Sequence, residues 1–288
     1  MKQWLLFIYL ATCIRVMAQA DTLYVYGPGG PYAPINEAAQ IFAKRNNLNI
    51  KVTKGPFSQW KDKARNNAHL IYSGAEFMMT QFISELGNVQ EQTVYPLYLR
   101  KSGLIVRKGN PKNIKTLKDL MKPELRIMVV NGAGLTGVWE DIAGKTQDIE
   151  VLRKIRKNIV LFAENSGQAQ SFWAKDPSID IWLSWNIWQK NNNGSADFVS
   201  LEDRYTTYRD CGIALTAYGE ANPKALEFYQ FLKGKEVQAL FEKQGWIERN
   251  PSAQKKKEDR KPQKVYSRKE KRSSLKQKKE GLLINHQS

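Results

Sequence analysis

The stretch from Val129 to Asp141, VVNGAGLTGVWED, combines residue types that can bind a negatively charged group. It opens with an apolar run typical of a buried strand, breaks at three glycines, and continues as a predicted helix from about Thr136. Glycines let a ligand approach the backbone closely, and the first N–H groups of a helix carry partial positive charge. The sequence therefore predicts an anion-binding turn at Gly132–Gly137.

Three further turns place glycines or small polar residues directly after predicted strands. They are Gly27–Gly30, Ser73-Gly74 and Ser184–Asn186. Their backbone N–H, hydroxyl and amide groups can donate hydrogen bonds to an oxyanion. Binding crevices in open α/β sheets lie at the carboxyl ends of strands, so we expect these turns to meet the glycine-rich one.

The pair Arg209-Asp210 has two interpretations. The two side chains can form an ion pair with each other at a hinge. Alternatively, Arg209 faces the crevice and binds a carboxylate or phosphate through two parallel hydrogen bonds.

Residues suited to catalysis or metal binding are scarce. The chain has two histidines, His69 and His286, and no Cys and His residues with the spacing of a metal site. A nucleophilic pair would need Cys211 and His69, but a single cysteine is more often a small buried hydrophobe. Glu140 and Asp141 suit the first turn of a helix, where the dipole stabilises acids. We therefore expect no enzyme activity and no metal.

Strands and helices alternate along the body of the chain. Predicted strands cover residues 23–26, 50–53, 70–72, 126–130, 159–162 and 179–183. Predicted helices cover residues 35–45, 60–67, 116–120, 136–144, 151–157, 166–174, 223–234 and 236–244. Such alternation indicates mostly parallel sheets flanked by helices. Two extended stretches, 95–106 and 205–217, can cross between lobes, so we assign residues 21–100 with 206–250 to one lobe and 101–205 to the other.

The first 20 residues have the pattern of a secretory signal. Lys2 precedes an apolar core at residues 4–14, and Ala18-Gln19-Ala20 forms a small-x-small cleavage site. A second interpretation is a lipoprotein signal with Cys13 lipidated, which Thr12 fits poorly. We expect soluble export to the periplasm.

Residues 251–288 differ in composition from the rest of the chain. Thirteen Lys and Arg against four acids give this segment a net charge of +9, out of +17 for the whole chain. Such a segment cannot bury a core, which predicts a disordered basic tail. Only Tyr266 is available to stack on bases, so nucleic acid is not favoured as a partner. The alternatives are a solvated extension and an arm that binds polyanions, as in an adhesin-like surface protein.

The glycines from Gly132 to Gly137 also match G-x-G-x-x-G, the dinucleotide-binding pattern. Glu164 follows the next predicted strand, near the position of an acid that would bind a ribose. This alternative predicts a periplasmic oxidoreductase that uses the turn for a dinucleotide. A soluble nicotinamide pool is not expected outside the cytoplasm, so we favour anion binding and expect no cofactor.

Several blocks of the chain form a combined pattern. They are LYVYGPGG at 23–30, QW at 59–60, IYSGAE at 71–76, GNP at 109–111, VNGAGLTGVWED at 130–141, WNIW at 185–188 and YRDCG at 208–212. This set resembles the accessory colonization factor AcfC family, a branch of the periplasmic solute-binding proteins related to sulfate and molybdate binders. The similarity runs from about Leu23 to Trp246.

The resemblance implies a two-lobed type II periplasmic binding protein fold that closes on a small anion. The anion would be a sulfate- or molybdate-like oxyanion or a small phosphorylated or carboxylated metabolite, delivered to an ABC transporter or chemoreceptor. The oligomeric state stays open, a dimer included. The implied ligand contacts, with Arg209 added from the interpretation above, are Gly29, Gly30, Ser73, Gly74, Gly134, Thr136, Gly137, Ser184, Asn186 and Arg209.

Overall fold

The computed structural model describes residues 22–248, except 191 and 193. The expected signal at residues 1–20 and the expected basic tail at 251–288 lie outside the described residues. The described residues belong to one compact unit. Within the described ranges, we find no helix that has both the length and the apolar character needed to cross a bilayer.

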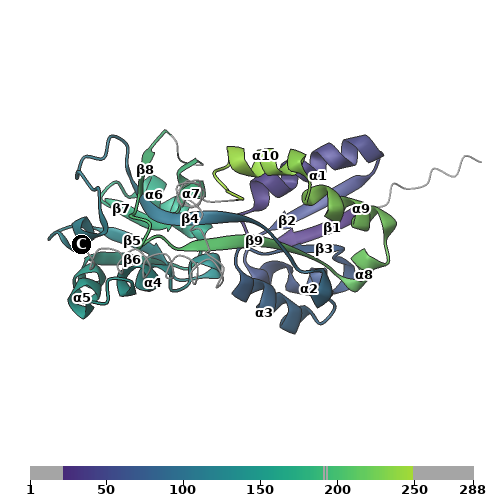
Figure 1. Cartoon of the computed structure of the whole chain (residues 1–288), viewed down its shortest axis with the longest axis horizontal. Coiled ribbons are helices and arrows are strands. Elements are labelled where there is room, and N and C mark those ends of the chain that lie inside the picture. Colours follow the sequence, from purple (N-terminus) through teal and green to yellow (C-terminus); the bar gives the residue numbers. More distant parts are fainter. Residues whose placement is uncertain (1–21, 191, 193, 249–288) are drawn as a thin grey trace, which may run out of the picture. The chain divides into compact units, whose positions relative to one another are not determined.

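The first lobe is built from three parallel strands, each followed by a helix (Figure 1). Its elements are β1 (Thr22–Gly27), α1 (Tyr32–Asn46), β2 (Asn49–Lys54), α2 (Phe57–Asn67), β3 (Leu70–Tyr72) and α3 (Glu76–Leu86). Strand β1 pairs in parallel with both β2 and β3. Helix α1 covers the sheet because Ile35, Ala38 and Phe42 recur at helical spacing and are buried.

Two long strands connect the lobes. After a short 3₁₀ helix, η1 (Glu91–Thr93), β4 (Tyr95–Arg107) leads into the second lobe, and β9 (Tyr208–Leu215) returns from it. The two strands pair antiparallel, with Arg100 opposite Arg209. Beyond this point β4 pairs with strands of the second lobe, so a single strand belongs to the sheets of both lobes.

The second lobe repeats the strand–helix arrangement around β5, which pairs in parallel with β6 and β7. Its elements are η2 (Leu117–Met121), β5 (Ile127–Val130), η3 (Ala133–Leu135), α4 (Val138–Gly144), α5 (Ile149–Asn158), β6 (Ile159–Ala163), α6 (Ser166–Lys175), β7 (Ile181–Trp185), α7 (Asn186–Lys190) and β8 (Ala196–Ser200). Strand β8 pairs antiparallel with β4.

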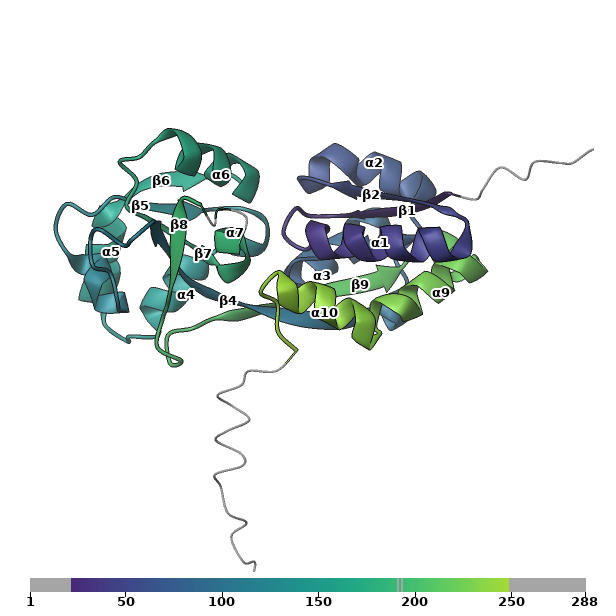
Figure 2. The same cartoon turned by 90° about the horizontal axis from the view of Figure 1, so that it is seen from above.

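The last described helices return to the first lobe (Figure 2). They are α8 (Ala217–Glu220), α9 (Pro223–Leu232) and α10 (Lys235–Lys243), and both α9 and α10 pack on α1. The strand order is β2-β1-β3-β9-β4-β7-β5-β6, with the connecting strands in the middle. Because the parallel strands of each lobe are followed by helices that begin near the other lobe, both sets of turns face the space between the lobes.

Two expected helices differ from the structure in start or in type. The helix expected from Thr136 begins at Val138, because Thr136 has a non-helical ψ of 125° and Gly137 adopts a left-handed φ of 73°. The segment expected as a helix at 116–120 is the 3₁₀ helix η2. Helices α3, α7 and α8 and strand β8 were not predicted at all. Helix α3 carries a readable signal, since Met78, Phe82 and Leu86 recur every four residues and are buried.

Candidate functional site

A cavity of about 990 Å³ lies between the turns of the two lobes. This volume is at the upper end of the range for small-molecule sites, ~300–1,000 Å³. The first lobe contributes the segments Pro28–Gly30, Tyr32–Pro34 and Lys54–Trp60 together with Gly74, among others. The second lobe contributes Ala133–Thr136, Glu164–Gly167 and Gln170, and the lining also includes Arg100, Trp185, Trp188 and Trp246.

Arg100 is the one arginine that lines this cavity in the part of the chain that the structure describes. It lies on β4 and is only 3% exposed. Its Nη2 donates to the carbonyl oxygen of Gly74, and its Nε has no hydrogen-bond partner. None of the ion pairs between residues 22 and 248, with 191 and 193 left out, includes Arg100. A buried guanidinium therefore lies beside the cavity without an acidic partner.

Three glycines from three separate turns make room for this guanidinium. A Cβ atom on Gly30 would overlap Nη1 of Arg100, and one on Gly134 would overlap Nη2. A Cβ on Gly74 would lie 3.0 Å from Nη2. Any side chain at Gly30 or Gly134 would force Arg100 to move. The glycines that were predicted as backbone donors to a ligand are thus also the walls around a cation.

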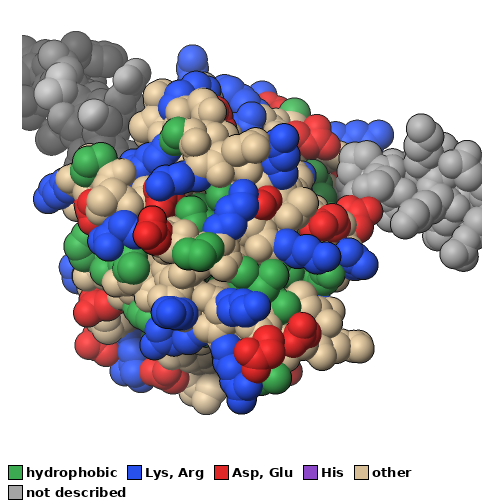
Figure 3. Space-filling view, turned by 90° about the vertical axis from the view of Figure 1, so that its left-hand side faces the viewer, with side chains coloured by type: hydrophobic (Ala, Val, Ile, Leu, Met, Phe, Trp, Pro, Cys, Tyr) green, Lys and Arg blue, Asp and Glu red, His purple; other side chains and the backbone are tan. Residues whose placement is uncertain are grey.

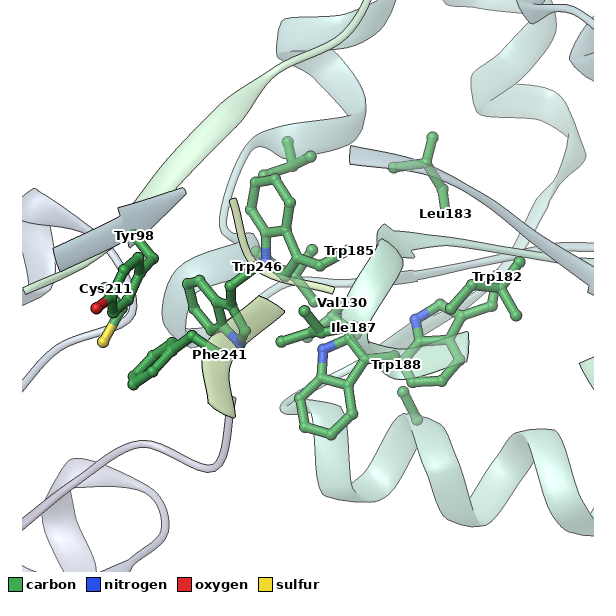
Figure 4. Close-up of a cluster of buried hydrophobic side chains, with 14 of the residues drawn as sticks. Tyr98, Val130, Trp182, Leu183, Trp185, Ile187, Trp188, Cys211, Phe241 and Trp246 are labelled. Atoms are coloured by element: carbon green, nitrogen blue, oxygen red, sulfur yellow. The ribbon is translucent and has the colours of Figure 1, made fainter. Parts of the chain in front are cut away.

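Aromatic rings hold the guanidinium on its other side. Its carbon Cζ lies 4.8 Å from the ring centre of Trp185 and 5.1 Å from that of Trp246. Figure 4 shows these two rings in one cluster with Trp188 and Ile187. Trp188 is largely buried and also lines the cavity. The rings attract the cation through their π faces but accept no conventional hydrogen bond from it, so the N–H groups that do not donate to Gly74 remain available.

The surroundings of Arg100 favour binding of an anion. Burial lowers the pKa of Arg100 to about 9, while Asp210 and Cys211 nearby oppose the shift. The side chain therefore remains protonated at neutral pH. Asp210 compensates the buried charge only through space and forms no ion pair with it, so an oxyanion beside the guanidinium would offset the remaining cost through charge-assisted hydrogen bonds.

Helix N-termini add partial positive charge around the same cavity. Helices α1, α2 and α6 each begin at lining residues: Tyr32, Phe57 and Ser166. Helix starts leave unpaired N–H groups and carry about half a positive charge. The whole surface is not uniformly basic, since Figure 3 shows Lys and Arg side chains mixed with Asp and Glu at the end of the second lobe. The positive potential at the cavity therefore comes in part from Arg100 and the N-termini of α1, α2 and α6.

Five of the ten predicted ligand residues line the cavity: Gly29, Gly30, Gly74, Gly134 and Thr136. Four others do not line the cavity: Ser73, Gly137, Ser184 and Asn186. Oγ of Ser73 is buried and accepts from the Gly212 N–H at 3.3 Å. Ser184 is fully buried, and its hydroxyl has no partner. The Asn186 side chain accepts from Lys101 N–H at 3.2 Å and donates to Gly245 at 2.6 Å, and Gly137 provides the left-handed residue before α4.

Arg209 also lies outside the cavity lining, behind the glycine-rich turn. Its Nη1 donates to the carbonyl oxygens of Gly134 at 3.0 Å and Thr136 at 3.1 Å. Its ion pair is with Asp141, at 3.1 Å, and not with Asp210. Arg209 therefore ties the returning strand β9 to the turn of the second lobe.

Sequence reasoning missed Arg100, because Leu97 and Leu99 alternate with it in the sequence and its burial is visible only in the structure. Along the first half of β4 the buried residues alternate as Tyr98, Arg100 and Ser102. Side chains two residues apart share one face of a strand, so this alternation places a charged residue on the buried face. A buried charge needs a partner or a ligand.

The residues considered for catalysis or metal binding do not form a reactive site among the residues described. Cys211 is completely buried, and burial raises the pKa of its thiol well above the ordinary value. Among residues 22–248, apart from 191 and 193, no three His, Cys, Asp or Glu side chains are placed to hold a metal ion.

Comparison with known proteins agrees with this geometry. A family model for bacterial extracellular solute-binding proteins matches residues 23–247. The crystal structure of Peb3 from Campylobacter jejuni is 32% identical, with a TM-score of 0.72, covering 79% of this chain and 100% of that chain. PEB3 with bound L-phospholactate is 33% identical, with a TM-score of 0.73 and the same coverage.

More distant structures share the fold. The sulfate-binding protein SubI from Mycobacterium tuberculosis H37Rv is 15% identical, with a TM-score of 0.67, covering 83% of this chain and 90% of that chain. A search of curated protein sequences gave no match. These structures confirm the expected two-lobed α/β fold class.

Proposed function

Because the chain belongs to the family of bacterial extracellular solute-binding proteins, we propose that it captures a small anion in the cavity between its lobes. The observation that carries this proposal is Arg100, a buried cation beside the cavity with no acidic partner among the residues described. Closure of the lobes would surround the anion with the guanidinium and with N–H groups from both sides.

The proposed contacts divide into two groups. Gly29, Gly30, Gly74, Gly134 and Thr136 line the cavity and would contact the anion beside Arg100. We propose a supporting role for Ser73, Gly137, Asn186 and Arg209, which hold the strands and turns that carry the first group. We assign no contact to Ser184, whose buried hydroxyl lies outside the lining.

The ligand class rests on the chemistry of the site and on one relative. PEB3, at 33% identity, has been crystallised with L-phospholactate, a small molecule that carries a phosphate group. An arginine binds phosphate, sulfate and carboxylate oxygens with the same two-pronged geometry. We propose an oxyanion group of this kind at Arg100.

The family match supports a proposal about where the protein works and what it delivers its ligand to. We propose that the chain is an AcfC-type member, is exported to the periplasm by residues 1–20, and passes its ligand to an ABC transporter or a chemoreceptor. The sequence blocks quoted above and the match over residues 23–247 support this assignment.

No observation favours the alternative, a dinucleotide-dependent oxidoreductase. Each glycine of the G-x-G-x-x-G pattern has a local explanation. A Cβ on Gly132 would overlap the carbonyl oxygen of Glu164, Gly134 makes room for Arg100, and Gly137 has a φ of 73°. The pattern is therefore accounted for without a cofactor.

The test is to measure binding by the natural chain and by Arg100→Gln. Native mass spectrometry of protein purified without refolding would look for a retained anion. Calorimetry would then measure affinities for sulfate, molybdate, inorganic phosphate and L-phospholactate. Removal of a buried charge partner predicts a loss of about 30-fold or more for Arg100→Gln.

Lys101→Gln provides the matched control. It removes the same charge from the next residue of β4, where Lys101 Nζ donates to Ser200 at 2.9 Å on an exposed surface. Its affinity should equal that of the natural chain. Equal affinity of Arg100→Gln and the natural chain, or no binding of any tested anion, would contradict the proposal.

A further inference from the structure

The cavity extends from Arg100 to a second cation, Lys54. Lys54 is the last residue of β2, the outermost strand of the first lobe, and it lines the same cavity. Figure 2 shows β2 and α2 on the side of the first lobe that faces away from the connecting strands β4 and β9. Of the lining residues, Arg100 and Lys54 carry the positive side chains.

Lys54 is held in place by a ring and not by an acid. Its Nζ lies 4.3 Å from the ring centre of Tyr32, which also lines the cavity. No ion pair within the described ranges includes Lys54. A neutral ring orients the ammonium group without cancelling its charge, so the charge remains available to a ligand.

The two cations come from different strands and line different parts of the same cavity. Arg100 reaches Gly30, which follows β1, and Lys54 pairs in register with Gly27 at the end of β1. In the strand order β1, β3 and β9 lie between β2, which carries Lys54, and β4, which carries Arg100, and adjacent strands are ~4.8 Å apart. A sulfate or molybdate at Arg100 would leave the Lys54 end of a 990 Å³ cavity empty of ligand.

We propose that Lys54 forms a second anion subsite and makes the protein selective for small organic dianions. The ligand would place one acidic group at Arg100 and a second, joined by a short carbon chain, at Lys54. This inference rests on the proposed function, because it assumes that the cavity binds an anion at Arg100.

The experiment compares ligands that have one or two acidic groups. Inorganic phosphate and propylphosphonate offer one group, whereas L-phospholactate and 3-phosphonopropionate add a carboxylate. Affinities are measured by calorimetry for the natural chain, Lys54→Gln and Lys51→Gln. Lys51 is the matched control, since it is an exposed lysine of the same strand that does not line the cavity.

We expect Lys54→Gln to weaken the better of the two carboxylate-bearing ligands by about fivefold, the size of an exposed ion pair. Binding of inorganic phosphate and propylphosphonate should be unchanged, and Lys51→Gln should change none of the four. The inference is overturned if Lys54→Gln leaves the carboxylate-bearing ligands unaffected or weakens all four equally.

Failure of the proposed function gives a different result. In that case the natural chain binds none of the four ligands, or Arg100→Gln binds them as tightly as the natural chain. If Arg100→Gln loses binding while Lys54→Gln keeps it for all four, only the second subsite is rejected.

Discussion

Arg209 donates a hydrogen bond to the carbonyl oxygen of Gly134 at 3.0 Å, joining strand β9 to the glycine-rich turn. The same nitrogen also reaches Thr136, and Asp141 holds the guanidinium from its far side. With these carbonyl oxygens directed at Arg209, the turn keeps its position beside Arg100. An arginine outside the cavity therefore helps to shape the cavity wall.

Replacing Arg209 should loosen this turn. For Arg209→Gln we expect a loss of about 1–3 kcal/mol in the free energy of unfolding, since charged hydrogen bonds to two carbonyl groups disappear. Anion affinity should also fall. Urea denaturation and calorimetry measure the two effects. Asp141→Asn is the control, because it removes only the ion pair of a side chain that is 50% exposed, which is worth about 0–1 kcal/mol. Equal losses in both variants would contradict a role for the carbonyl contacts.

Two glycines of the same turn should respond differently to alanine. Gly134→Ala places a Cβ against Arg100, so we expect reduced anion affinity. Gly137→Ala meets nothing within 4 Å but has a φ of 73°, so we expect a stability loss of about 1–2 kcal/mol with affinity kept. Calorimetry and thermal unfolding of both variants separate the effects. Unchanged affinity in Gly134→Ala would show that Arg100 can move freely.

Asp119 should make the stability of the second lobe dependent on pH. Burial alone would raise the pKa of Asp119, but hydrogen bonds from Lys122, Lys115 and Thr116 hold it well below its ordinary value. The stabilisation is therefore complete above the unfolded value, near pH 4, and is lost as the pH falls toward the lowered pKa.

The variant Asp119→Asn tests this dependence. At pH 7 we expect it to lower the free energy of unfolding by about 1 kcal/mol, the usual contribution of a cap. The difference from the natural chain should shrink below about pH 4. Asp62→Asn, which affects a side chain that is 86% exposed, should change stability little at any pH. A constant difference for Asp119→Asn down to pH 2 would contradict the assignment.

Cys211 should be chemically inert in the folded protein. It is fully buried, and its raised pKa leaves little reactive thiolate at neutral pH. In the chain from Asp21 onward, where Cys211 is the sole cysteine, we expect slow maleimide labelling in buffer and complete labelling in urea, measured by mass spectrometry. Rapid labelling of the folded chain would contradict this prediction and would favour Cys211 as a reactive nucleophile.

Local patterns were sufficient for most of the elements. The helix predicted at 35–45 lies within α1, whose Ile35, Ala38 and Phe42 are buried at helical spacing. The strand predicted at 70–72 is β3 with its observed bounds. The start of α4 was misjudged because Gly137 takes a left-handed conformation. A single glycine can take either hand, so the pattern of residue types does not fix which turn conformation is used.

The candidate site was only partly predictable for a related reason. The sequence by itself determined which turns follow strands, because strand and helix periods and glycine positions are local properties, and five of the predicted residues line the cavity. Only the tertiary structure decided that Gly30, Gly74 and Gly134 surround Arg100, and that Arg209 lies behind the turn. These contacts join residues far apart in the chain, so their geometry depends on how the two lobes pack around β4 and β9.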